Sequence, residues 1–106
     1  MICKLVWFVP PAALEGTRDA VFAAGAGRIG HYERCSWYTE GTGTFLGGAQ
    51  TQPTIGERGR EERVTEMRVE TVVPEEHVAA VVAALRAAHP YEEVPFDVYR
   101  MMDPLA

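Results

Sequence analysis

The sequence predicts a single α+β domain in which a strand–helix–strand unit occurs twice. Its 106 residues give room for one domain, residues 1–106. When Val9-Pro10 is laid on Val73-Pro74, Ala23-Ala24 falls on Ala87-Ala88. Each copy contains a β-type run, a proline, a helical segment and a second β-type run. Such an internal repeat dictates the architecture.

The first copy opens with an almost unbroken apolar run over 3–9, which is typical of a central strand. The two prolines that follow suit the first turn of a helix, where a missing N–H group is tolerated. Gly25 or Gly27 ends this helix. A second strand is expected over 31–38.

The second copy shows the clearer periodicities. Apolar or small residues alternate with charged ones at Met67, Val69, Thr71 and Val73. This alternation indicates a half-buried strand. Pro74 begins a helix whose apolar stripe consists of Val78, Val81, Val82 and Leu85. His89-Pro90 stops the helix, and 96–101 forms the last strand.

The order βαββαβ predicts a ferredoxin-like sandwich, with a four-stranded antiparallel sheet and two helices on one face. The other face has no helix to cover it. If that face carries aromatic residues such as Trp7, Trp37 or Tyr99, another subunit is the natural candidate to cover them. Six glycines fall between the copies, and we expect a glycine-rich loop at about 41–62, partly an extended hairpin.

Charge and composition exclude several classes of partner. The net charge is −5, which disfavours nucleic acid and acidic membrane surfaces. The sequence has no apolar run long enough to span a membrane. Cys3 and Cys35 are expected to be reduced thiols in a cytoplasmic protein.

Two motifs suggest ligands and also have simpler explanations. Residues 25–30 spell GxGxxG, but they follow a helix and precede a strand, the reverse of a dinucleotide site. A helix end followed by a turn explains them. His31, Glu33 and Cys35 would share one face of the expected strand and could hold a divalent metal ion. Cys35 is equally well explained as a small core residue.

The segment His89-Pro90-Tyr91-Glu92-Glu93 is the densest cluster of reactive groups. Near a helix C-terminus the protonated form of His89 is favoured. The segment is either a helix stop followed by a turn or a contact with a ligand or subunit. No nucleophile with an obvious base emerges, so we assign no catalytic residue.

This segment, together with Val94-Pro95 and Asp97-Val98-Tyr99, resembles the Nif-three-like family and, more distantly, CutA. The resemblance also covers 4–10, 24–32, 35–36, 40–45 and 66–74. It implies a fold similar to CutA and the PII signalling proteins, which are trimeric. It further implies a standalone version of a domain that full-length members carry inserted in a larger protein with a dinuclear metal centre. The ligands of that centre belong to the larger part, so its chemistry does not transfer to this chain.

Two hypotheses about function follow. The first is a non-enzymatic, oligomeric binding or regulatory module for a small ligand, metal ion or protein partner. Its candidate contacts are His89, Tyr91, Glu92, Glu93, Glu40, Gly41 and Gly43. The alternative is a metal-dependent hydrolase that uses His31, Cys35 and His89 as ligands. His31 and the bulky pair Trp37-Tyr38 depart from the family pattern and leave room for a site peculiar to this chain.

Overall fold

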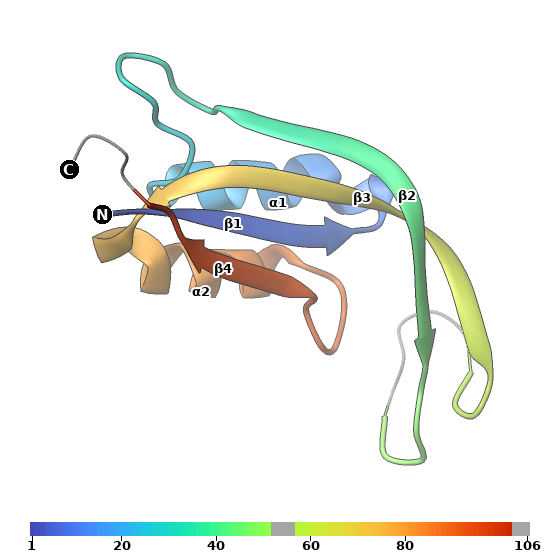
Figure 1. Ribbon diagram of the computed structural model, residues 1–106. Helices are drawn as coiled ribbons and strands as arrows, with labels where there is room; N and C mark the ends of the chain where they lie inside the picture. The colour runs from blue at the N-terminus through green and yellow to red at the C-terminus, as the bar shows by residue number, and fades with distance from the viewer. Residues whose placement is uncertain (52–56, 103–106) are drawn as a thin grey trace.

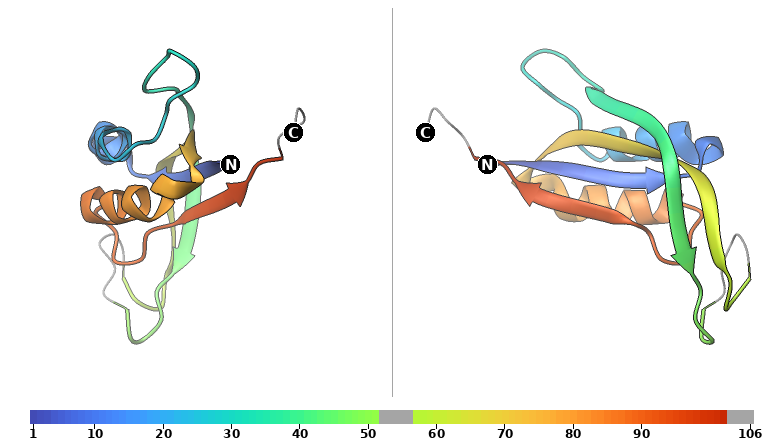
Figure 2. Two further views of the ribbon diagram at one scale, coloured as in Figure 1. Left: turned by 90° about the vertical axis from the view of Figure 1, so that its left-hand side faces the viewer. Right: turned by 45° about the vertical axis from the view of Figure 1, so that its right-hand side comes forward.

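The computed structural model describes residues 1–51 and 57–102. In this part of the chain the strands are β1 (Ile2–Val9), β2 (Ser36–Leu46), β3 (Glu61–Pro74) and β4 (Phe96–Arg100), and the α-helices are α1 (Leu14–Ala23) and α2 (Val78–Ala88). The strands form one antiparallel sheet in the order β2-β3-β1-β4. Both helices cover the same face of this sheet (Figure 1, Figure 2). The predicted ferredoxin-like fold is confirmed.

The internal repeat is visible in the backbone. Pro10 and Pro74 take nearly the same extended conformation, with φ of −59° and −58°. A single 3-10 turn follows each proline, η1 (Pro11–Ala13) and η2 (Glu75–His77), and the α-helix begins directly after it. Proline fixes φ and supplies no N–H, which makes it suited to the residue before a helix. The repeated proline therefore sets the direction of both helices.

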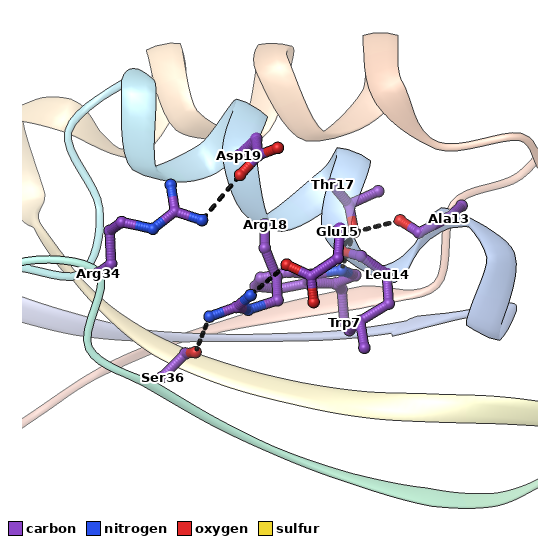
Figure 3. Close-up of polar contacts among 9 residues, drawn as sticks. All are labelled: Trp7, Ala13, Leu14, Glu15, Thr17, Arg18, Asp19, Arg34 and Ser36. Carbon is purple, nitrogen blue, oxygen red and sulfur yellow. Dashed lines mark hydrogen bonds and ion pairs between the residues drawn. The ribbon is translucent and has the colours of Figure 1, made fainter.

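The core lies between the sheet and the two helices. Its fully buried members are Leu5, Trp7, Val9, Val21, Val69, Val73, Val81 and Leu85. Trp7, one of the three aromatic residues considered for the open face, lies on the other face. Trp7 pairs with Val69 and is wholly buried, and its indole N–H donates to the hydroxyl of Thr17 on α1 at 3.0 Å (Figure 3). An unbroken apolar strand does not reveal which of its faces meets the helices, because both alternating sets of residues are apolar.

The open face of the sheet carries the other two aromatic residues expected there. Trp37 is 58% exposed and Tyr99 is 55% exposed. The register places Trp37 opposite Glu70, which forms an ion pair with Lys4 at 3.6 Å. Apolar rings and paired charges therefore share this surface.

The segment between α1 and β2 is a loop, whereas a strand was expected over 31–38. Gly27 and Gly30 before the expected strand and Arg34 within it have positive φ angles, which lie outside the β region. The strand begins only at Ser36 (Figure 1). Polar contacts attach the start of β2 to α1: Arg18 reaches the Ser36 hydroxyl at 3.4 Å and also pairs with Glu15 (Figure 3).

The glycine-rich segment is more regular than the loop expected at about 41–62. Residues 41–46 belong to β2, and 61–62 belong to β3. Beyond Val9, which pairs with Met67, the stretches 41–46 and 61–66 pair only with each other. This two-stranded ribbon continues past the end of β1 and curves down across the end of the sheet (Figure 1). Gly56 lies outside the described residues. The hairpin that was expected in part is therefore the main feature of this segment.

The two ends of the described chain lie on neighbouring strands. The first strand, β1, pairs with the last, β4, and the Met101 N–H donates to the Ile2 carbonyl at 3.0 Å. Among the described residues, no helix is long and apolar enough to cross a membrane.

Candidate functional site

The segment 89–95 connects α2 to β4 and is attached at both ends to the backbone of one residue. The Phe8 carbonyl lies 2.7 Å from Nε2 of His89, and the Phe8 N–H donates to the Pro95 carbonyl at 3.1 Å. The helix ends at His89, whose extended conformation (φ −85°, ψ 137°) precedes a proline as expected. The segment is thereby held at the end of β1.

The hydrogen bonds of His89 define its protonation state. The Tyr91 N–H donates to Nδ1 at 3.1 Å, so Nδ1 carries no proton and Nε2 donates to the Phe8 carbonyl. Burial lowers the pKa of His89, although the Phe8 carbonyl and the Glu66 charge oppose this effect. The structure therefore favours the neutral form over the protonated form expected from the helix C-terminus, because His89 is only 7% exposed and Nδ1 accepts a hydrogen bond.

Tyr91 fixes the segment to the ribbon. Its hydroxyl donates to Oε2 of Glu66 on β3 at 2.8 Å. Burial and this hydrogen bond raise the pKa of Tyr91 well above its ordinary value. A Cβ on Gly43 would lie 1.8 Å from Oε1 of Glu66. The missing side chain at Gly43 thus leaves the space that the Glu66 carboxylate occupies.

A pocket of about 290 Å³ lies between the ribbon and segment 89–95. Its lining comes from the end of β2 and the turn after it, from β3, and from the segment itself. The lining residues are Thr44, Phe45, Leu46, Gly47, Thr51, Glu66, Tyr91, Glu92, Glu93 and Pro95. Apolar and aromatic side chains meet carboxylates here.

The structure brings together only some of the candidate contacts. Tyr91, Glu92 and Glu93 line the pocket. His89 does not line the pocket but holds the segment through its contact with the Phe8 carbonyl. Gly43 leaves the space that the Glu66 carboxylate occupies. The other two candidates, Glu40 and Gly41, are exposed on β2 outside this lining.

The candidate metal ligands are separated. His31 is exposed in the loop before β2, Cys35 lies beside Gly27 and Thr71, and His89 is bound to Phe8. Within the described ranges, no three His, Cys, Asp or Glu side chains are grouped so that they could hold a metal ion. Cys35 and His31 also lack the strand that was expected to align them.

Sequence reasoning missed Glu66 and the apolar wall formed by Phe45, Leu46 and Pro95. Glu66 is one of the charged residues that alternate with Met67 and Val69, and such a position is ordinarily solvent-facing. Its signal lies in the opposite strand, where Gly41 pairs with Glu66 and Gly43 lies diagonally across. Two glycines facing one carboxylate mark a place where a side chain lies flat on a strand.

Comparison with known proteins identifies the chain's relatives. No protein-family model matches it. The chain is 52% identical over 101 residues to a GTP cyclohydrolase 1 type 2 homolog of Mycobacterium tuberculosis, covering 95% of this chain and 27% of that protein. A protein of the same description from Bacillus subtilis is 45% identical over 96 residues, covering 91% and 26%. The chain thus spans about a quarter of the length of these curated relatives.

Comparison with solved structures identifies proteins of the same fold. The Bacillus cereus protein related to NIF3 superposes with a TM-score of 0.81 at 43% identity, covering 96% of this chain and 26% of that one. The CutA protein of Archaeoglobus fulgidus gives a TM-score of 0.71 at 15% identity (97% and 86% covered), and GlnK of B. subtilis gives 0.62 at 17% (94% and 84%). The chain is related in sequence to one segment of the Nif-three-like proteins and has the fold shared by CutA and the PII-like protein GlnK.

Proposed function

We propose that this chain is a non-enzymatic, oligomeric binding or regulatory module whose ligand or partner enters the pocket between the ribbon and segment 89–95. One observation carries the proposal: a segment fixed to both β1 and β3 closes a pocket lined by its own polar groups. Concave sites with an apolar wall and a few placed polar groups are the usual form of ligand sites.

The state of the polar groups favours binding over catalysis. Both nitrogens of His89 are engaged in hydrogen bonds, and burial lowers its pKa. The Tyr91 hydroxyl is committed to Glu66, and its pKa is raised. A general base needs an accepting atom directed at the substrate. These two groups instead support the wall of the pocket.

We propose further that the module forms a homo-oligomer through the open face of its sheet. Trp37 and Tyr99 are more than half exposed on this face, and exposed aromatic residues on an uncovered sheet favour a protein contact. The resemblance to CutA and the PII proteins favours a trimer. We propose the cytoplasm as its compartment, since Cys3 and Cys35 are free thiols.

A fragment screen followed by nuclear magnetic resonance tests the proposal. Fragments that bind are expected to shift the amide signals of Gly47, Thr51 and Glu93, which line the pocket. Phe45→Ala should abolish these shifts because it removes one wall. Tyr32→Ala should leave them unchanged, because Tyr32 is a 77% exposed aromatic residue outside the pocket.

Two results would contradict the proposal. The pocket would not be the site if no fragment shifts its amides or if the shifts gather elsewhere on the surface. Light scattering of the same samples should give a trimer mass, and a monomer mass at micromolar concentration would remove the assembly part.

A further inference from the structure

The charged side chains that the described part of the chain contributes to the pocket are all negative. Three of its lining residues are glutamates, Glu66, Glu92 and Glu93. None of the described lining residues is a lysine, arginine or histidine. A ligand that carries phosphate or carboxylate groups would therefore be repelled, and a cation would be attracted.

The arginines before and in the ribbon direct their guanidinium groups elsewhere, and none of them lines the pocket. Arg60 is bound to Glu62 at 2.6 Å, and Arg63 lies 3.6 Å from Glu61. Arg58 donates to the Ala49 carbonyl at 2.9 Å. The basic residues of the ribbon are thus engaged with groups outside the pocket lining.

One of the three carboxylates is held in place before any ligand arrives. Glu66 accepts from the Tyr91 hydroxyl and lies flat over Gly43. The Tyr91 hydroxyl is neutral, so the hydrogen bond orients the carboxylate without cancelling its charge. A pre-organised acceptor loses less side-chain entropy on binding than a freely moving one.

The pocket also contains two aromatic side chains and an apolar wall. Phe45 and Tyr91 line it together with Leu46 and Pro95. Aromatic rings beside carboxylates are suited to organic cations, which gain both charge pairing and cation–π attraction. A volume of about 290 Å³ is at the small end of ligand sites.

We infer that the pocket binds a small organic cation, with one ammonium or amidinium head directed at the glutamates and a short apolar or aromatic body against Phe45, Leu46 and Pro95. This inference rests on the proposed function, because it names the ligand class of the same pocket. The charge of the glutamates favours the cationic group of the ligand, and the apolar wall favours its apolar part.

Three probes of similar size and different charge test the inference: 2-phenylethylammonium, 2-phenylethanol and 3-phenylpropionate. Titrations followed by the pocket amides should show the cation binding about tenfold more tightly than the alcohol. The carboxylate should bind most weakly. Added salt should weaken the binding of the cation alone.

Variants assign the effect to particular carboxylates. Glu66→Gln keeps an oxygen that can accept from Tyr91 and removes the charge, and Glu93→Gln removes a second charge from the lining. Each should reduce affinity for the cation several-fold and leave the alcohol unchanged. Glu33→Gln makes the same change of net charge at an exposed loop residue outside the lining and should have no effect.

The possible failures are distinguishable from failure of the proposed function. Equal binding of cation and alcohol, tighter binding of the carboxylate, or no binding by the three probes would each overturn the inference. If the fragment screen still maps neutral or anionic fragments to the pocket, the proposed function stands. If it maps nothing there, both are wrong.

Discussion

The two strand–helix units of this chain are copies in sequence, but the chain leaves their helices by different means. After α1, glycine and backbone hydrogen bonds direct the chain: the Gly27 N–H donates to the Val72 carbonyl, and the Cys35 N–H donates to the Gly27 carbonyl, both at 2.8 Å. After α2, the His89 side chain directs it by bridging Phe8 and Tyr91.

The two connections are therefore sensitive to different changes: the first to added side chains and the second to pH. A turn built from glycine and backbone groups has nothing to titrate, but it has no room for a Cβ atom. A turn built on a buried imidazole tolerates side chains around it, but it depends on the protonation state of one residue. Only the second turn borders the candidate ligand pocket.

The largest effect is expected from Gly27→Ala. The added Cβ would lie 2.7 Å from the Phe22 ring at a φ of +85°, so steric overlap adds to backbone strain. We expect a loss of about 3 kcal/mol in the free energy of unfolding, measured with urea. Gly30→Ala is the control, because Gly30 also has positive φ but open space around it. It should lose only about 1 kcal/mol. Equal losses would show that contact with Phe22 is unimportant.

A smaller, pH-dependent effect is expected from His89→Asn. The pKa of His89 lies below its ordinary value of 6.5 in the folded protein, so the unfolded chain binds the proton more readily. Its contribution to stability is complete above about pH 6.5 and is lost as the pH falls toward the folded pKa. His89→Asn should reduce stability by about 1–2 kcal/mol at pH 7 and remove this decline.

The control for His89 is His77→Gln, since His77 is exposed in the turn before α2. Urea unfolding curves at several pH values between 5 and 8 provide the comparison. If stability still declines at low pH in His89→Asn but no longer declines in His77→Gln, then His77 causes the pH dependence and the assignment to His89 is wrong.

Tyr91→Phe should have the smallest effect. It removes one hydrogen bond to a half-buried carboxylate, which contributes about 1 kcal/mol. Tyr32→Phe, at an exposed loop residue outside the pocket, should change nothing. Thermal or urea unfolding would measure both. If Tyr91→Phe destabilises more than His89→Asn, the segment is held mainly by the ribbon and not by β1.

Most of the fold could be predicted because each of its parts has a local signal. The repeated proline marks the start of both helices, and the alternation around Val69 marks a half-buried strand. The strand expected over 31–38 was wrong before Ser36. Its residues favour extended structure, whereas Arg34 has a positive φ angle and pairs with Asp19 on α1, a contact that no local pattern indicates. The side of the sheet on which Trp7 lies depends on its pairing with Val69. Local sequence patterns do not predict this pairing.

The candidate site was predicted on segment 89–93 and, through Gly41 and Gly43, on the glycine-rich stretch that becomes β2. The segment around Tyr91 stands out because it combines titratable residues with a proline. Its partner Glu66 does not, since a charged residue in an alternating strand is ordinarily solvent-exposed. The contact forms because the ribbon curves toward segment 89–95, and this curvature is a property of two paired strands. The sequence therefore indicated the two stretches that meet at the pocket, but not Glu66, Phe45, Leu46 or Pro95.

The pairing of the first and last strands determines how this unit can be connected to other sequences. The Ile2 carbonyl and the Met101 N–H share a hydrogen bond, so the points of entry and exit are about 5 Å apart, the spacing of neighbouring strands. Polypeptide joined to both points would leave from the same end of the sheet. A unit with adjacent ends can be inserted into a surface turn of another protein without separating the two ends of that turn. The pocket, at the opposite end of β1, would stay accessible to solvent.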